Sequence, residues 1–218
     1  MFRIQLLALV MLLSGCVSHI PIAQQIPSVD YVSKETIVVA VVDQRERVKN
    51  GKPRTFIGVA HGAFGIPADW NVNPVLAVEE GDKKRDLAQF LQYRIVQGLA
   101  EKGWNAIEAA SQTTAPTDEE TNKILSDAGA QSLLLLKLNE WYFSINLNWV
   151  GSFNFDTDTE VVVYRSAVGK TLEKRFAGRD VIEQEASQSP QNHILMAYRN
   201  QLAEILNDPE VKRALTGE

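Results

Sequence analysis

The sequence predicts an α+β fold, with a mostly antiparallel sheet that includes a C-terminal strand meander and about three helices packed on one face. Residues 36–42 are an apolar, β-branched run, which is typical of a central strand covered on both faces. Residues 133–181 contain three stretches that are typical of consecutive strands. Apolar residues recur at helical spacing in 82–102, 117–129 and 189–208. A strand meander flanked by helices favours the α+β class.

The first sixteen residues match a bacterial lipoprotein signal. Arg3 precedes an apolar run over residues 6–13 that is too short to span a bilayer. Two small residues, the second of them Gly15, then present Cys16, which is the single cysteine of the chain. In this signal, the lipobox, the cysteine thiol receives a diacylglycerol, cleavage follows between Gly15 and Cys16, and the new amino terminus is acylated. We therefore expect residues 1–15 to be a signal peptide and Cys16 to be a lipid anchor.

The residue after the anchor indicates a location. It is Val17, whereas an aspartate there favours retention in the inner membrane of enterobacteria. By this resemblance we expect an anchor in the outer membrane of a Gram-negative bacterium, on its periplasmic face. Residues 16–35 contain two prolines and no sustained period, so we expect a lipidated tether. Residues 36–218 are long enough for one well-buried α+β domain and short for two.

Residues that favour the ends of helices and strands place the remaining elements. Thr117 and Glu120 have the spacing of a capping box, and Ser189 followed by Pro190 is a favourable helix start. The expected elements are a short strand at 54–59, a helix from 82 or 83 to 102 that ends at Gly103, a strand at 104–110, a helix from Thr117 to Gly129, and a helix from Ser189 to Asp208.

The meander changes phase along its first strand. Apolar residues occupy even positions over 134–138 and odd positions over 141–149, so we expect a bulge or bend near 139–140. The second strand, 153–163, is apolar at odd positions, so odd residues pair with odd residues across a three- or five-residue loop around Gly151. Its opposite face is polar to acidic. A third strand is expected over 171–181.

One face of this hairpin is aromatic, and it allows two interpretations. Either helices cover the face and make it core, or it is an exposed surface that binds a protein or an acyl chain. The residues concerned are Trp141, Phe143, Trp149, Phe153 and Phe155.

Taken in order, these features resemble the YajG-like family of bacterial lipoproteins. The shared features are the lipobox at Cys16, the strand that ends in Asp43-Gln44-Arg45, the helix opened by Arg85-Asp86-Leu87, Gly103 followed by Trp104, and a late strand meander with a terminal helix. The long insertion between Arg45 and Asp82 departs from the family pattern. The resemblance implies an outer-membrane lipoprotein and carries over no catalytic residue.

Motifs for enzymatic chemistry are sparse. The three histidines, His19, His61 and His193, lack the spacing of metal ligands, so no metal or cofactor is predicted. Glycines at 58, 62 and 65 miss the spacing of a dinucleotide loop. The formal net charge of −5 argues against nucleic-acid binding, which needs a basic face.

Two charged clusters have both a functional and a structural interpretation. Acidic residues at 156, 158 and 160 supply oxygen ligands but lack the loop of a Ca²⁺ site, which favours a solvated strand face. Basic residues at 45, 47, 49, 52 and 54 suit anionic lipid headgroups, although such residues near a strand end are usually solvated.

The sequence therefore predicts a non-enzymatic, lipid-anchored accessory or interaction protein of the cell envelope. Its expected partners are the membrane, through the lipid, and an envelope protein. The candidate partner-binding residues are His61, Phe64 and Trp70 in one loop, and Trp149 and Phe153 at the hairpin tip. The alternative is a carrier of lipid or lipopolysaccharide that holds acyl chains on the aromatic face. A cell-wall enzyme is a third, less favoured class.

Overall fold

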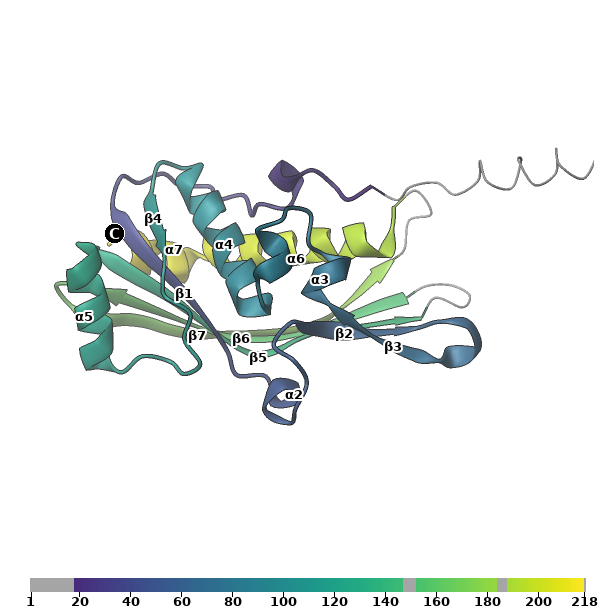
Figure 1. Ribbon diagram of the computed structural model, residues 1–218. Helices are drawn as coiled ribbons and strands as arrows, with labels where there is room; N and C mark the ends of the chain where they lie inside the picture. The colour runs from purple at the N-terminus through teal and green to yellow at the C-terminus, as the bar shows by residue number, and fades with distance from the viewer. Residues whose placement is uncertain (1–17, 147–151, 184–187, 218) are drawn as a thin grey trace, which may run out of the picture.

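A mixed β-sheet forms the centre of the protein (Figure 1). The computed structural model describes residues 18–146, 152–183 and 188–217. Within them the sheet has seven strands: β1 (Thr36–Asp43), β2 (Phe56–His61), β3 (Pro67–Asn71), β4 (Asn105–Glu108), β5 (Ser132–Asn146), β6 (Ser152–Arg165) and β7 (Gly169–Glu183). The long β5–β6 and β6–β7 ladders are antiparallel, so most paired residues are antiparallel, and the predicted meander matches in part, because its first strand β5 also has parallel partners. The centre differs, because β1 is parallel to β4 and β5, and β2 is parallel to β5.

The described residues form six helices where about three are predicted, and these lie on both faces of the sheet, which corrects the expectation of one face. The described helices are α2 (Glu46–Lys49), α3 (Val72–Val75), α4 (Leu87–Ala100), α5 (Asp118–Ala128), α6 (Pro190–Asn207) and α7 (Pro209–Thr216), with short 3₁₀ turns η1 (Ile22–Gln24), η2 (Ala63–Gly65) and η3 (Asp82–Lys84). Helices α4, α6 and α7 share one hydrophobic cluster, whereas α5 packs on the other face. The reason is β1, whose residues are apolar on both faces: Val39 faces the first cluster, and Val38 faces Leu125 of α5.

Capping interactions set the helix ends. The predicted capping box of α5 is present, with Glu120 N–H donating to Thr117 Oγ1 and Thr117 N–H donating to Glu120. Helix α4 begins at Leu87, later than predicted, because Asp86 and Gln89 form a second capping box. Ser189 caps α6 as expected.

The described part of the aromatic face of the meander is core. The predicted change of phase is confirmed as a register shift between Leu138 and Glu140. Phe143 pairs with Phe155 across the strands and stacks on it, with ring centroids 4.5 Å apart. Tyr198 of α6 packs on the same rings and lies 5.3 Å from the ring of Trp141. The loop expected around Gly151 lies outside the described residues.

The segment before β1 packs on the domain, although the sequence predicts a tether. Val29 and Tyr31 are buried, and Pro27 lies against Gly98 of α4. Gln25 accepts a hydrogen bond of 2.9 Å from the buried guanidinium of Arg94. The apolar residues of this segment follow no period, so the pattern could not show that they are buried.

Strands β1 and β2 lie end to end along the same edge of β5. The ladder with β1 ends at Leu138, and the ladder with β2 begins at Phe143. Between them the chain leaves the sheet through α2 and returns. This arrangement gives β5 two parallel partners in tandem on one side and β6 along its whole length on the other (Figure 1).

Arg45 fills the junction between these two strands. Its side chain is fully buried and makes a bidentate ion pair with Asp43 at 2.7 and 2.9 Å. Its Nη1 also donates to the carbonyl oxygens of Phe56 in β2, at 2.6 Å, and Trp141 in β5, at 3.3 Å. One guanidinium therefore joins three strands. The expectation that Arg45 is a solvated surface residue is wrong, because its charge is neutralised and its donors are satisfied inside the protein.

Replacing Arg45 by alanine leaves the buried Asp43 carboxylate without its partner. We expect Arg45→Ala to lower the free energy of unfolding by about 3–5 kcal/mol, measured by urea denaturation. The matched control is Arg175→Ala, which removes a bidentate pair with Asp158 at the surface and costs at most about 1 kcal/mol. Equal losses in the two variants would contradict the role of Arg45.

The packing of the initial segment gives a second prediction. A Cβ at Gly98 would lie 2.5 Å from the carbonyl oxygen of Pro27. Helix propensity alone favours Gly98→Ala by about 1 kcal/mol, yet we expect a net loss of about 1–3 kcal/mol from the clash. Gly81→Ala, where a Cβ meets open space, should change the free energy of unfolding by less than about 0.5 kcal/mol. A stabilised Gly98→Ala variant would show that Pro27 is not held against α4.

Candidate functional site

The loop that the sequence singles out is a β-hairpin. Strands β2 and β3 pair from Phe56 and Asn71 to His61 and Pro67, so only residues 62–66 form the turn, called here the hairpin tip. Gly62 N–H donates to the Ile66 carbonyl, and Gly65 N–H donates to the Gly62 carbonyl, both at 3.0 Å. The hairpin projects from the end of the sheet at which α6 begins (Figure 1).

Two large apolar side chains are exposed at this tip. Phe64 is 99 % exposed and Ile66 is 65 % exposed. Phe64 also has a φ of +61°, in the left-handed region that bulky side chains rarely adopt. Neither packing nor backbone preference explains a phenylalanine at this position. Exposure and backbone strain together make Phe64 the strongest candidate for a contact residue.

The base of the hairpin is held firmly by the sheet. Strand β2 pairs with β5 from Gly58 to His61, and a Cβ at Gly58 would lie 2.3 Å from the Phe143 carbonyl oxygen. The close approach of the two backbones therefore requires glycine at this position. On β3, Trp70 packs against the core and Asn71 accepts a 3.0 Å hydrogen bond from the hydroxyl of Thr55.

The hairpin tip lies at the same end of the molecule as the start of the described chain. The amide of Ile20 donates to Asn192 Oδ1 at 2.9 Å, at the beginning of α6. The neighbouring His193 ring lies 5.5 Å from the ring of Phe153. Phe153 pairs with Ile145, which pairs with Ala60 near the end of β2. These contacts connect Ile20 to the strand that leads into the tip.

The structure separates the predicted partner-binding residues. His61 is half-buried at the end of β2, Phe64 is exposed, and Trp70 is half-buried. Phe153 is a core residue under α6, which removes it from any binding surface. Gly15, Cys16 and Trp149 lie outside the described residues. Ile66 was not singled out from the sequence, because its exposure follows from the hairpin and not from a motif.

The remaining basic residues of the predicted cluster all have acidic partners. The pairs are Arg47–Glu140, Lys49–Glu46, Lys52–Asp69 and Arg54–Asp86. This pairing leaves little net positive charge to attract anionic headgroups.

The acidic face of the meander is likewise neutralised. Asp156 pairs with Arg179, Asp158 with Arg175, and Glu160 with Lys137. The hydrogen bond from Arg175 is the main cause of a lowered pKa of the Asp158 carboxyl. No group of three or more metal-binding side chains occurs in the described part of the chain. The expectation of an ordinary solvated strand face is consistent with these pairs.

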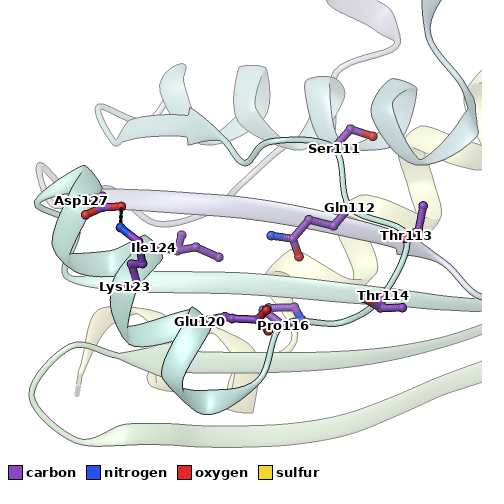
Figure 2. A pocket seen from close by; sticks show the side chains of 9 residues that line it. All are labelled: Ser111, Gln112, Thr113, Thr114, Pro116, Glu120, Lys123, Ile124 and Asp127. Atoms are coloured by element: carbon purple, nitrogen blue, oxygen red, sulfur yellow. Dashed lines mark hydrogen bonds and ion pairs between the residues drawn. The ribbon is translucent and has the colours of Figure 1, made fainter.

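A shallow surface hollow of about 460 Å³ lies between residues 111–116 and α5, and Figure 2 shows its lining. Its charged groups are engaged in local interactions: Lys123 pairs with Asp127, and Glu120 accepts from Thr117 in the capping box. The other lining residues are mainly small and polar. These properties make the hollow a weaker candidate than the hairpin tip.

No helix in the described ranges is both long enough and apolar enough to cross a membrane. No family model matches the chain, and no curated protein matches its sequence. The resemblance to the YajG-like family therefore stays a prediction.

Solved structures of bacterial proteins show a distant likeness. A Xanthomonas campestris protein with the family model DUF330 shares 10 % identity over 92 % of this chain and 93 % of its own, with a TM-score of 0.46. Lipoprotein GNA1162 from Neisseria meningitidis shares 12 % sequence identity over 78 % of this chain and 99 % of its own, with a TM-score of 0.39. The LpoB C-terminal domain from Escherichia coli shares 10 % sequence identity over 75 % of this chain and 93 % of its own, with a TM-score of 0.31. At these scores the likeness supports no statement about function.

If the role of Phe64 is to contact a binding partner and not to stabilise the fold, replacing its side chain should not destabilise the protein. We expect Phe64→Asn to leave the free energy of unfolding unchanged or to raise it by up to about 1 kcal/mol, because asparagine tolerates the left-handed region better. Trp70→Ala, which removes a packed ring from the same hairpin, should lower it by about 1–3 kcal/mol. Thermal and urea denaturation measure both, and a destabilised Phe64→Asn variant would assign Phe64 a structural role.

Proposed function

We propose that this protein is a non-enzymatic lipoprotein, anchored through Cys16 to the periplasmic face of the outer membrane, where its domain acts as an accessory protein that binds another envelope component. Lipid anchoring confines such a domain to a thin layer and raises its effective concentration for partners held in the same membrane.

The observation that carries the proposal is that the described chain is packed from its first residues. His19 Nε2 lies 2.9 Å from the Val75 carbonyl oxygen, and Ile20 is bonded to Asn192. Cys16 precedes Ser18 by two residues, which span at most about 7 Å. A lipid on Cys16 would therefore hold the domain directly against the bilayer in a restricted range of orientations.

The packing of the aromatic face argues against the alternative of a lipid carrier. A carrier needs an apolar space for acyl chains next to these rings. Instead Tyr198 lies within 5.6 Å, centroid to centroid, of the rings of Trp141, Phe143 and Phe155. The described part of this face is filled by the protein itself, which supports interaction over transport.

The surface offered to a partner is the polar face of the meander. Helix α5 covers this face only near the beginning of β5, where it packs against Leu133 and Leu135. Farther along, β6 and β7 present cross-strand pairs between Arg175 and Asp158 and between Arg179 and Asp156. Both arginine side chains are 67 % exposed, and their pairing with Asp158 and Asp156 makes this a rigid face of alternating charges, which suits a partner surface of alternating charges.

The anchor is tested first. Wild-type protein should sediment with the outer membrane and show the mass of acyl groups on Cys16, whereas Cys16→Ala should remain soluble in the periplasm, because no thiol is left to receive the diacylglycerol. Intact-mass spectrometry and membrane fractionation measure both. Wild-type protein without acyl mass, or Cys16→Ala that stays on the membrane, would contradict the anchor.

The same cells, treated with a cross-linker, test the partner. We expect one discrete cross-linked product that is lost in Cys16→Ala and in Arg175→Glu/Arg179→Glu. Lys123→Glu on α5 is the matched control, since it also reverses an exposed, ion-paired cation. A product that persists in the arginine double variant would exclude this face as the binding surface.

A further inference from the structure

We propose that the hairpin tip is a second membrane contact, in which Phe64 and Ile66 insert into the boundary between headgroups and acyl chains of the bilayer that holds the anchor. The inference rests on the proposed anchoring through Cys16 and names the lipid surface as the ligand of the hairpin.

The composition of the tip suits this ligand. Residues 62–68 contain no charged side chain, and the first charge beyond them, Asp69, is paired with Lys52. Transfer of charged side chains into lipid is unfavourable, whereas transfer of exposed phenylalanine and isoleucine side chains is favourable. Trp70 follows on β3, and its ring type is common at membrane interfaces.

Part of the backbone of the tip is already hydrogen-bonded internally, which suits a less polar surrounding. The amides of Gly62 and Gly65 already donate hydrogen bonds within the turn, and the ladder between β2 and β3 pairs the flanking residues. Backbone groups that are bonded internally lose little when water is removed, whereas free ones oppose entry into lipid.

The position of the tip favours a lipid surface over a protein partner. The contacts from Ile20 through Asn192, His193 and Phe153 place the chain start at the end of the domain at which β2 ends. Cys16 lies within about 7 Å of Ser18, so the membrane that takes its lipid faces this end of the domain. The tip extends past His61, the last residue of β2 that pairs with described residues of β5, and points out of this same end (Figure 1).

Two contacts at one end of the domain would fix its orientation. A single point of lipid attachment leaves the domain free to rotate about that point, and a second, apolar contact removes that freedom. The opposite end of the sheet, at the turn between β6 and β7, would then face away from the membrane, because Arg165 pairs with Ser132 at the start of β5.

The test uses the full lipidated protein with a fluorescent probe at the tip. Lipidation occupies Cys16, the single native cysteine, so Phe64→Cys supplies one free thiol for an environment-sensitive dye. The protein is reconstituted on vesicles of phosphatidylethanolamine and phosphatidylglycerol. We expect a blue shift of the emission and a loss of intensity when nitroxide-labelled lipids are included. Ile66→Cys, labelled in the same way, gives an independent reading.

Val168→Cys is the matched control. Val168 is 75 % exposed and lies in the turn between β6 and β7, at the other end of the sheet, so its emission should stay that of a solvent-exposed dye. Emission at 64 and 66 equal to that at 168 would overturn the proposal. So would a dye at 64 that becomes protected only after a membrane protein fraction is added, because the tip would then bind protein.

Intact mass distinguishes this failure from failure of the proposed function. Acyl mass on Cys16 together with a solvent-exposed dye at 64 overturns the hairpin contact alone. Absence of acyl mass removes the anchor and overturns both. Circular dichroism of each variant confirms that the fold is retained.

Discussion

The sheet depends on the way β5 holds two partners end to end along one edge, and Arg45 is the interaction that makes this possible. A gap in a ladder normally leaves backbone groups without partners, at a cost in free energy. Here one guanidinium donates to carbonyl oxygens of β2 and β5 and is neutralised by Asp43 of β1. A buried ion pair adds little net stability compared with apolar packing, so its value lies in fixing the position of β2.

The hairpin inherits its position from this junction. Because β2 is held at its start by Arg45 and along its length by β5, the tip extends beyond the sheet on a rigid base. The same end of β5 carries the aromatic core that α6 covers, and α6 in turn binds the start of the described chain through Asn192. The fold thereby brings the aromatic core, the hairpin and the start of the described chain to one end of the domain. This is the end that would face the membrane if Cys16 carries the proposed lipid.

The sequence predicts the parts of this structure that leave a periodic or capping signal. The bulge after Leu138 follows from a change of parity, and the end of α5 follows from Gly129. The face of the sheet on which α5 packs cannot be predicted from the sequence. Both faces of β1 are apolar, so the hydrophobic period of the strand does not distinguish them. Arg45 has no sequence signal for burial, since a charged residue is usually exposed. The sequence identified the loop with Phe64, but only the hairpin geometry shows that Ile66 is exposed beside it.

The central claim is that the anchor and the hairpin tip face one membrane, and hydrogen exchange tests it most directly. The amide exchange rates of the lipidated protein on vesicles are compared with those of the Cys16→Ala variant, which carries no lipid anchor, in solution. The account predicts that added protection is confined to peptides covering residues 18–20 and 61–67, and that the turn at 165–169 is unchanged. Protection at 165–169, or none at 61–67, would contradict it.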